Sequence, residues 1–139
     1  MKPEEIRSQV LRIVESMNKN HNMKALVAVA APSFVMHGVE ADMNLQQFVE
    51  AMDSGFKGFP DLKLEAYRTV AEQDSLAIWY TITGTHKGEW AGIPATGKKI
   101  KYSAAQFVRS MGDKLVESWL LQDNLGIMQQ LGAIPAPKK

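Results

Sequence analysis

The sequence predicts an α+β fold in which N-terminal helices pack on one face of a curved antiparallel sheet. Two patterns predict it. Apolar residues recur at helical spacing as far as Phe56, and from Leu62 onward apolar and polar residues alternate with the period of two typical of strands. A chain of 139 residues is long enough for one core and too short for two ordinary domains, so residues 1–139 are interpreted as a single domain.

The N-terminal segment is predicted to be an amphipathic helix. Pro3 and the acidic pair Glu4 and Glu5 are favoured in the first turn of a helix, because proline lacks an N–H and carboxylates complement the helix dipole. The apolar side chains at helical spacing, which would face the core, are Ile6, Val10, Ile13, Val14 and Met17.

Two more helices are predicted before the sheet. One covers residues 21–29 and ends before Pro32, after which residues 33–37 are predicted to form a short strand. The other begins after Asn44, which forms a capping-box-like pair with Gln47, and ends at Gly58.

The second half is predicted to be an antiparallel meander with a terminal helix. The expected strands are 62–70, 75–86, 100–111 and 114–122, and the expected helix is 125–131. Gly112 and Asp113 form the tight turn between the last two strands. Residues 136–139 are expected to be a frayed tail.

The composition excludes several classes of function. A formal net charge of +1 gives no field that would attract nucleic acid, and no apolar run approaches the ~20 residues of a membrane span. No signal pattern opens the chain, so a cytoplasmic location is expected. The absence of cysteine removes disulfides and thiolate chemistry, which leaves carboxylates, His, Tyr and hydroxyls.

The loop between the second and third long strands, residues 87–99, is longer than a hairpin requires, and such loops are often functional. Around it the runs GTHKGEWAGIPATGKKI and FVRSMGDKLVESWLLQDNLGIMQQLGAIP, preceded by APSFVMHG and FPDLKLE, resemble the signatures of the SnoaL-like polyketide cyclase family of the nuclear transport factor 2-like superfamily. The resemblance covers nearly the whole chain. It implies a cone-shaped α+β barrel of the cystatin-like type with an enclosed pocket for an apolar small molecule.

The same resemblance implies a reaction. Cyclases of this family close a ring by intramolecular aldol condensation, in which a base removes a proton from carbon between carbonyls and a donor stabilises the enolate. Asp123 matches the catalytic carboxylate of the family. Trp119 lies four residues earlier, so a regular strand would place both on one face, with the indole ring as a wall of the pocket.

A second interpretation of Asp123 stays open. A carboxylate that acts as a base at neutral pH needs an apolar, enclosed setting. Asp123 also directly precedes a predicted helix and can be its N-cap, in which case its oxygens accept backbone N–H bonds and it becomes a weaker base.

Two histidines are candidate catalytic groups beside Asp123. His86 matches a family position near the pocket and is predicted to donate a hydrogen bond to a substrate oxygen or relay a proton, although it can equally anchor the loop. His37 would add a polar group from the opposite wall, with a purely structural role as the alternative.

The remaining candidates would line the pocket and bind substrate. An apolar cavity with a few directing polar groups is typical of small-molecule sites, and plain core packing is the alternative for each residue. These candidates are Trp119, Phe34, Tyr67, Tyr80, Trp90, Tyr102 and Gln106.

Neither a metal nor an organic cofactor is predicted. The three histidines form no local ligand motif, and the resemblance implies cofactor-independent catalysis. A homodimer is expected by resemblance, because the second face of the sheet carries aromatic and aliphatic residues that are costly to leave exposed. The main alternative function is a binding protein of the same fold that holds an apolar ligand without transforming it.

Overall fold

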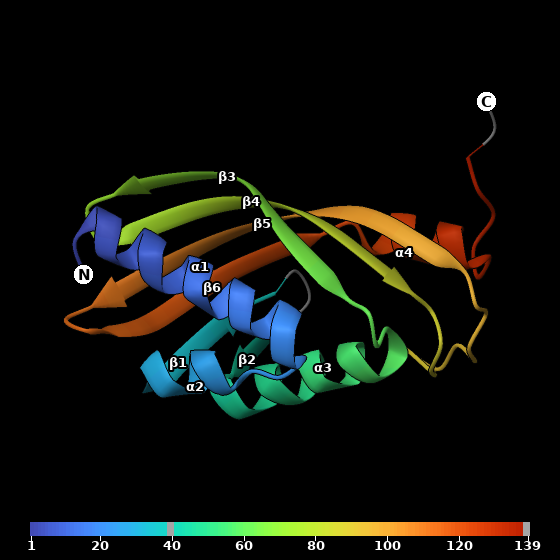
Figure 1. The fold of residues 1–139 in the computed structure, drawn as a ribbon, viewed down its shortest axis with the longest axis horizontal. Helices are drawn as coiled ribbons and strands as arrows, with labels where there is room; N and C mark the ends of the chain where they lie inside the picture. The colour runs from blue at the N-terminus through green and yellow to red at the C-terminus, as the bar shows by residue number, and fades with distance from the viewer. Residues whose placement is uncertain (39–40, 138–139) are drawn as a thin grey trace.

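A six-stranded sheet organises the computed structural model, which describes residues 1–38 and 41–137. Its strands are β1 (Ala30–His37), β2 (Asp42–Asn44), β3 (Lys63–Glu72), β4 (Ser75–Thr85), β5 (Lys99–Met111) and β6 (Lys114–Gln122). They lie in the order β2-β1-β6-β5-β4-β3, and every neighbouring pair is antiparallel except β1 and β6. Figure 1 shows the long strands curving over the N-terminal helices, which confirms the predicted α+β class.

The helices are α1 (Pro3–Asn20), α2 (Lys24–Val29), α3 (Leu45–Gly58) and α4 (Asn124–Leu131). Helices α1, α2 and α3 lie on one side of the sheet, and α4 packs against β5 at its far end (Figure 1). We call the side that faces α1 the inner face and the opposite side the outer face. The five residues predicted for the buried stripe of α1 are all buried. Each such aliphatic side chain stabilises the fold by roughly 1.5–3 kcal/mol.

The predicted start of α3 is confirmed in atomic detail. Asn44 Oδ1 accepts a 2.8 Å hydrogen bond from the backbone N–H of Gln47, and the Asn44 N–H donates to Gln47 Oε1 at 2.9 Å. This capping box satisfies two backbone donors that would otherwise lack partners.

Two element boundaries differ from the sequence prediction by three residues, and one short strand was not predicted. The second helix begins at Lys24 rather than at residue 21, because His21 adopts a left-handed backbone (φ 52°) that ends α1. Strand β1 begins already at Ala30 and contains Pro32. The short strand β2 was not predicted, since three residues are too few to show an alternating pattern.

Two β-bulges change which side chains face inward. In β6 the pairing with β5 passes from Arg109–Glu117 to Ser110–Leu115, so Val116 is the extra residue. Leu115 and Ser118 are therefore both buried although they differ in parity. In β3 the pairing with β4 skips Tyr67 in the same way.

The loop after β4 packs tightly against the end of α3. The backbone N–H groups of Lys87 and Gly88 donate to the Gly58 carbonyl at 3.0 and 3.1 Å. A Cβ at Gly88 would lie 2.3 Å from the Lys57 carbonyl oxygen, so only glycine allows this approach. The loop is thus held to the end of α3 by backbone contacts.

Residues 132–137, which follow α4, form neither helix nor strand. The tail predicted over residues 136–139 lies partly outside the described residues, and residues 136 and 137 are exposed without helix or strand. Over the described part of the chain, no helix combines the length and the apolar character needed to cross a membrane.

Candidate functional site

A cavity of about 150 Å³ lies between the helices and the inner face of the sheet. Its wall is almost entirely apolar, because helices α1 and α3 and the strands all turn their apolar sides to it. Representative wall residues are Val14 and Met17 of α1, Met52 and Gly55 of α3, and Ile127 of α4. Each of these elements places its buried stripe there by its own periodicity.

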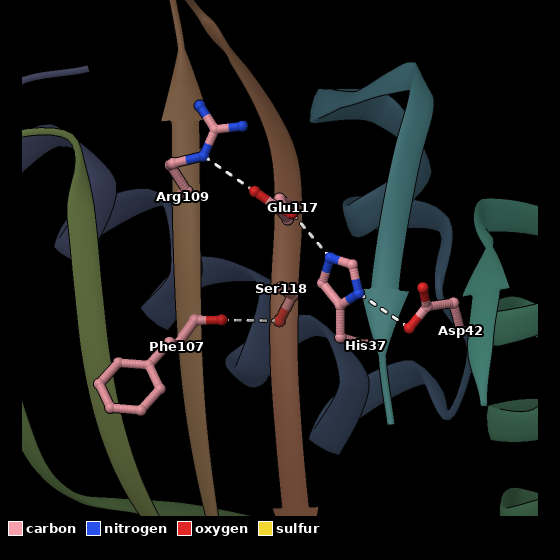
Figure 2. A network of polar contacts seen from close by, with 6 residues as sticks. All are labelled: His37, Asp42, Phe107, Arg109, Glu117 and Ser118. Carbon is pink, nitrogen blue, oxygen red and sulfur yellow. Dashed lines mark hydrogen bonds and ion pairs between the residues drawn. The ribbon is translucent and has the colours of Figure 1, made fainter. Parts of the chain in front are cut away.

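A row of polar side chains crosses this apolar cavity along three neighbouring strands. The Tyr80 hydroxyl donates to Gln106 Oε1 at 2.8 Å, and Gln106 Nε2 donates to Ser118 Oγ at 2.8 Å. Ser118 Oγ in turn donates to the Phe107 carbonyl oxygen at 2.9 Å (Figure 2). Tyr80, Gln106 and Ser118, which we call the polar row, all line the cavity.

Burial keeps the phenols of the cavity protonated. It raises the pKa of Tyr102 from its ordinary value of 10.0 to about 12, and it raises the pKa of Tyr80 further. Both hydroxyls are therefore neutral at physiological pH. The Tyr80 hydroxyl donates its one proton to Gln106, whereas a neutral phenol such as Tyr102 suits a carbonyl oxygen in an otherwise apolar ligand.

Most of the predicted lining residues do surround this cavity. Phe34, Tyr80, Trp90, Tyr102 and Gln106 all line it. They come from β1, β4, the following loop and β5, and the three strand residues from β4 and β5 lie on the inner face.

Trp119, Tyr67 and His37 are not where the sequence prediction put them. Trp119 and His37 border a separate groove on the outer face, where their rings stack with centroids 5.1 Å apart. The bulge at Val116 explains this, because it reverses the parity that would have carried Trp119 inward with Leu115. Tyr67 is the extra residue of the bulge in β3, and its side chain is 77% exposed.

His37 belongs to a charge network instead of the cavity wall. Its Nδ1 lies 2.8 Å from Asp42 Oδ1 and its Nε2 lies 2.7 Å from Glu117 Oε2. Glu117 Oε1 accepts a 3.0 Å hydrogen bond from Arg109 Nε (Figure 2). The hydrogen bonds that Asp42 and Glu117 accept from the ring raise the pKa of His37.

His86 is fully buried directly behind the cavity. Its ring stacks on Phe59, a wall residue, with centroids 5.2 Å apart. Nδ1 accepts the backbone N–H of Thr96 at 3.2 Å, which anchors the loop. Among the described residues, no group lies within hydrogen-bond distance of the buried Nε2. In the tautomer that accepts at Nδ1, the ring N–H is at this atom.

Asp123 is the N-cap of α4. Its Oδ1 accepts a hydrogen bond from the backbone N–H of Gly126 at 2.9 Å. The residue is exposed and is not part of the cavity wall, whereas its neighbour Gln122 is. The geometry therefore matches the capping interpretation of this side chain.

Sequence reasoning missed Ser118 and Gln122 as cavity residues. Both lie an even number of residues from Leu120, so the alternation of β6 places the three on one face. Which of the two faces of β6 points to the cavity depends on the bulge, and local periodicity does not reveal it. Among the described residues that line the cavity, none is an Asp, Glu, His or Lys. Within residues 1–38 and 41–137, no three or more His, Asp or Glu side chains form a group suited to a metal ion.

Solved structures with the same architecture are numerous. AclR from Streptomyces galilaeus, a candidate hydroxylase, is 28% identical over 99% of this chain and 87% of its own, with a TM-score of 0.92. A candidate polyketide cyclase from Acidithiobacillus ferrooxidans is 25% identical, covering 93% of this chain and 95% of its own, with a TM-score of 0.79. A candidate SnoaL-like polyketide cyclase from Jannaschia sp. CCS1 is 18% identical over 96% and 95% of the two chains, with a TM-score of 0.87, which shows the fold.

Sequence comparison gives the family. No functionally curated protein matches the chain significantly. The family model for SnoaL-like polyketide cyclases matches residues 8–131. This range includes the cavity, the polar row and all helices and strands apart from the first residues of α1. The chain belongs to the SnoaL-like polyketide cyclase family.

Proposed function

We propose that this protein takes an apolar small molecule that carries a carbonyl or hydroxyl oxygen into the cavity. The polar row carries the proposal. Tyr80, Gln106 and Ser118 form a continuous polar stripe in a wall that, apart from Gln122, is built mostly from aliphatic, aromatic and Met side chains. An apolar site with few convergent polar groups selects ligands by shape and orients them through one or two oxygens.

The proposed reaction is a cofactor-independent, cyclase-type ring closure of such a carbonyl compound. A base would remove a proton from the carbon between two carbonyls, and the enolate would attack a third carbonyl carbon of the same molecule. That step forms a carbon–carbon bond, and the new alkoxide takes up a proton. Family membership supports this class of reaction, and the neutral phenol of Tyr102 is a suitable donor for the enolate oxygen, while the Tyr80 hydroxyl donates to Gln106.

Asp123 remains the proposed base. For this role its carboxylate would have to leave the Gly126 N–H and turn past Gln122 toward the cavity. Binding of substrate against Gln122 is the event that would make such a movement productive. His86 is the proposed second donor, for which Phe59 would have to move so that Nε2 can reach a substrate oxygen.

A binding protein without catalysis is the second candidate. The observation that favours it is the capping bond of Asp123, which satisfies the carboxylate outside the cavity. AclR, at 28% identity, is a candidate hydroxylase rather than a cyclase, so the family as a whole does not determine one reaction.

Binding is tested first, with the fluorescent probe anilinonaphthalene sulfonate and two variants of Gly55. A Cβ at this cavity residue meets no heavy atom within 4 Å, so Gly55→Ala leaves the cavity open. Gly55→Leu fills it. We expect the leucine variant to lose probe fluorescence and the alanine variant to keep it. Equal binding by both variants would place the probe elsewhere and contradict the cavity proposal.

Base catalysis is tested by solvent deuterium exchange at the acidic carbon of a phenyl β-keto ester. Wild-type protein is expected to accelerate the exchange, and Asp123→Asn, which retains a capping oxygen, is expected to abolish the acceleration. Binding without any acceleration by the wild type would support the second candidate. Acceleration that survives in Asp123→Asn would exclude Asp123 as the base.

We further propose that a second copy of the chain covers the outer face of the sheet. Large apolar side chains are exposed there on four neighbouring strands: Tyr67 and Val70 on β3, Trp79 on β4, Phe107 and Met111 on β5, and Trp119 and Leu121 on β6. Strands β3 to β6 span roughly 700 Å² at ordinary strand spacing, close to the ~800 Å² that each partner contributes to a standard interface. Such an apolar patch is costly in water.

A further inference from the structure

The network around His37 joins four strands on the outer face of the sheet. Asp42 comes from β2, His37 from β1, Glu117 from β6 and Arg109 from β5 (Figure 2). These are neighbours in the strand order β2-β1-β6-β5. The network therefore runs from the β2 edge of the sheet to its middle.

The distances favour the protonated form of His37. Both ring nitrogens lie within 3 Å of a carboxylate oxygen, at 2.8 Å for Asp42 and 2.7 Å for Glu117. An ionised carboxylate can only accept, so both contacts are hydrogen bonds only when both nitrogens donate, which is the imidazolium form. With Arg109 on the other oxygen of Glu117, the network alternates negative and positive groups from Asp42 to Arg109.

A neutral His37 cannot keep both contacts. It retains one N–H, and its other nitrogen would turn a lone pair toward a carboxylate oxygen. Glu117 keeps its bond to Arg109 and has a side chain only 26% exposed, whereas the Asp42 side chain is 65% exposed. The contact to Asp42 is thus the one that opens.

Asp42 stands just before an element of the cavity wall. It begins the three-residue strand β2, whose last residue, Asn44, is the N-cap of α3. Helix α3 lines the cavity through Phe48, Ala51, Met52 and Gly55. Strand β2 is at the edge of the sheet and pairs with β1 alone, so it has few ladder hydrogen bonds of its own.

We propose that His37 is a pH-sensitive latch that holds strand β2 and the first turn of α3 to the sheet when the ring is protonated. Loss of the proton releases the β2 edge and loosens the α3 wall of the cavity. The latch itself requires no ligand, and its consequence for binding rests on the proposed function of the cavity.

The raised pKa of His37 and the lowered pKa of Glu117 together set the pH range in which the latch is closed. The pKa of His37 is raised by its hydrogen bonds to Asp42 and Glu117, so its stabilisation is fully present below the ordinary value of 6.5 and is lost as pH rises through the raised value. The pKa of Glu117 is lowered by its hydrogen bond to His37 and by Arg109, so its contribution is lost as pH falls below 4.5. The latch is closed between these limits.

Amide hydrogen exchange of the full-length protein tests the latch without a ligand. The His37 ring is titrated by NMR, and exchange of residues 42–48, corrected for the intrinsic rate, is measured on both sides of its transition. We expect roughly a tenfold loss of protection in 42–48 above the transition, with α1 unchanged. Asp42→Asn is expected to remove the pH step, whereas His21→Asn, which changes a histidine outside the network, is expected to leave it.

Three results would overturn the proposal. The first is amide protection of residues 42–48 that stays constant across the His37 titration. The second is a pH-dependent step in protection of equal size in Asp42→Asn. The third is a measured midpoint of the His37 titration below 6.5. Probe binding to the cavity is measured in parallel over the same pH range. Failure of the probe to bind at any pH would count against the proposed cavity function, while the exchange data would still decide the latch.

Discussion

Asp123 Oδ1 lies 2.9 Å from the backbone nitrogen of Gly126 and caps helix α4. The bond satisfies one of the free N–H groups at the start of the helix, and it holds the carboxylate outside the cavity wall. The side chain that family resemblance indicates as a base thus has a structural role in the observed conformation.

The cap predicts unequal effects of two substitutions at Asp123. Asp123→Ala removes the acceptor and is expected to lower the free energy of unfolding by about 1 kcal/mol, while Asp123→Asn, which keeps an oxygen, is expected to change it much less. Urea denaturation of the two variants beside the wild type measures the difference. Equal losses in both variants would mean that charge, and not the capping bond, stabilises this position.

Gly88 is predicted to be intolerant of any side chain. A Cβ there would lie 2.3 Å from the Lys57 carbonyl oxygen, so Gly88→Ala must displace the loop from the end of α3. We expect a loss of about 1–3 kcal/mol in the free energy of unfolding. Gly55→Ala is the matched control, since its Cβ meets nothing within 4 Å and alanine favours the helix by up to about 1 kcal/mol. A Gly88→Ala variant as stable as Gly55→Ala would contradict the close approach.

The buried phenols predict a loss of stability in alkali. The pKa of Tyr102 is raised by burial from 10.0 to about 12, so the native state holds protons that the unfolded chain releases. Stability is therefore expected to be complete below pH 10 and to fall as pH rises toward 12. Ultraviolet absorbance of tyrosinate, followed in wild type and Tyr102→Phe, measures this ionisation. Ionisation of Tyr102 near 10 in the folded protein would show that the site is open to water.

The proposed dimer predicts that a charged substitution on the outer face lowers the mass of the species in solution. Wild-type protein is expected to sediment as a dimer and Phe107→Glu as a monomer, because a twofold interface places the substituted residue in the contact twice. Val27→Glu is the control, since Val27 is an exposed apolar residue of α2 on the helical side of the sheet. Sedimentation equilibrium distinguishes the species. A wild-type protein that remains monomeric at high concentration would contradict the proposed dimer.

Local rules explain most of the fold. The buried stripe of α1, the capping box of Asn44 and Gln47, and the span of β6 all follow from neighbours in sequence, and the structure confirms each of them. These features depend on contacts within a few residues, which a single chain displays directly. The cavity residues Tyr80 and Gln106 could be predicted for the same reason, since β4 and β5 pair in register without a bulge.

The sequence by itself thus determined the α+β class, most element boundaries, the family, and the parts of the cavity on regular strands. Only the tertiary structure decided the inner and outer faces of β6, where the extra residue Val116 sends Ser118 inward and Trp119 outward. It alone also brought His37 to Glu117, 80 positions apart in sequence. A bulge changes the direction of every later side chain in its strand, and long-range pairing sets which charges meet, so neither is encoded in local periodicity.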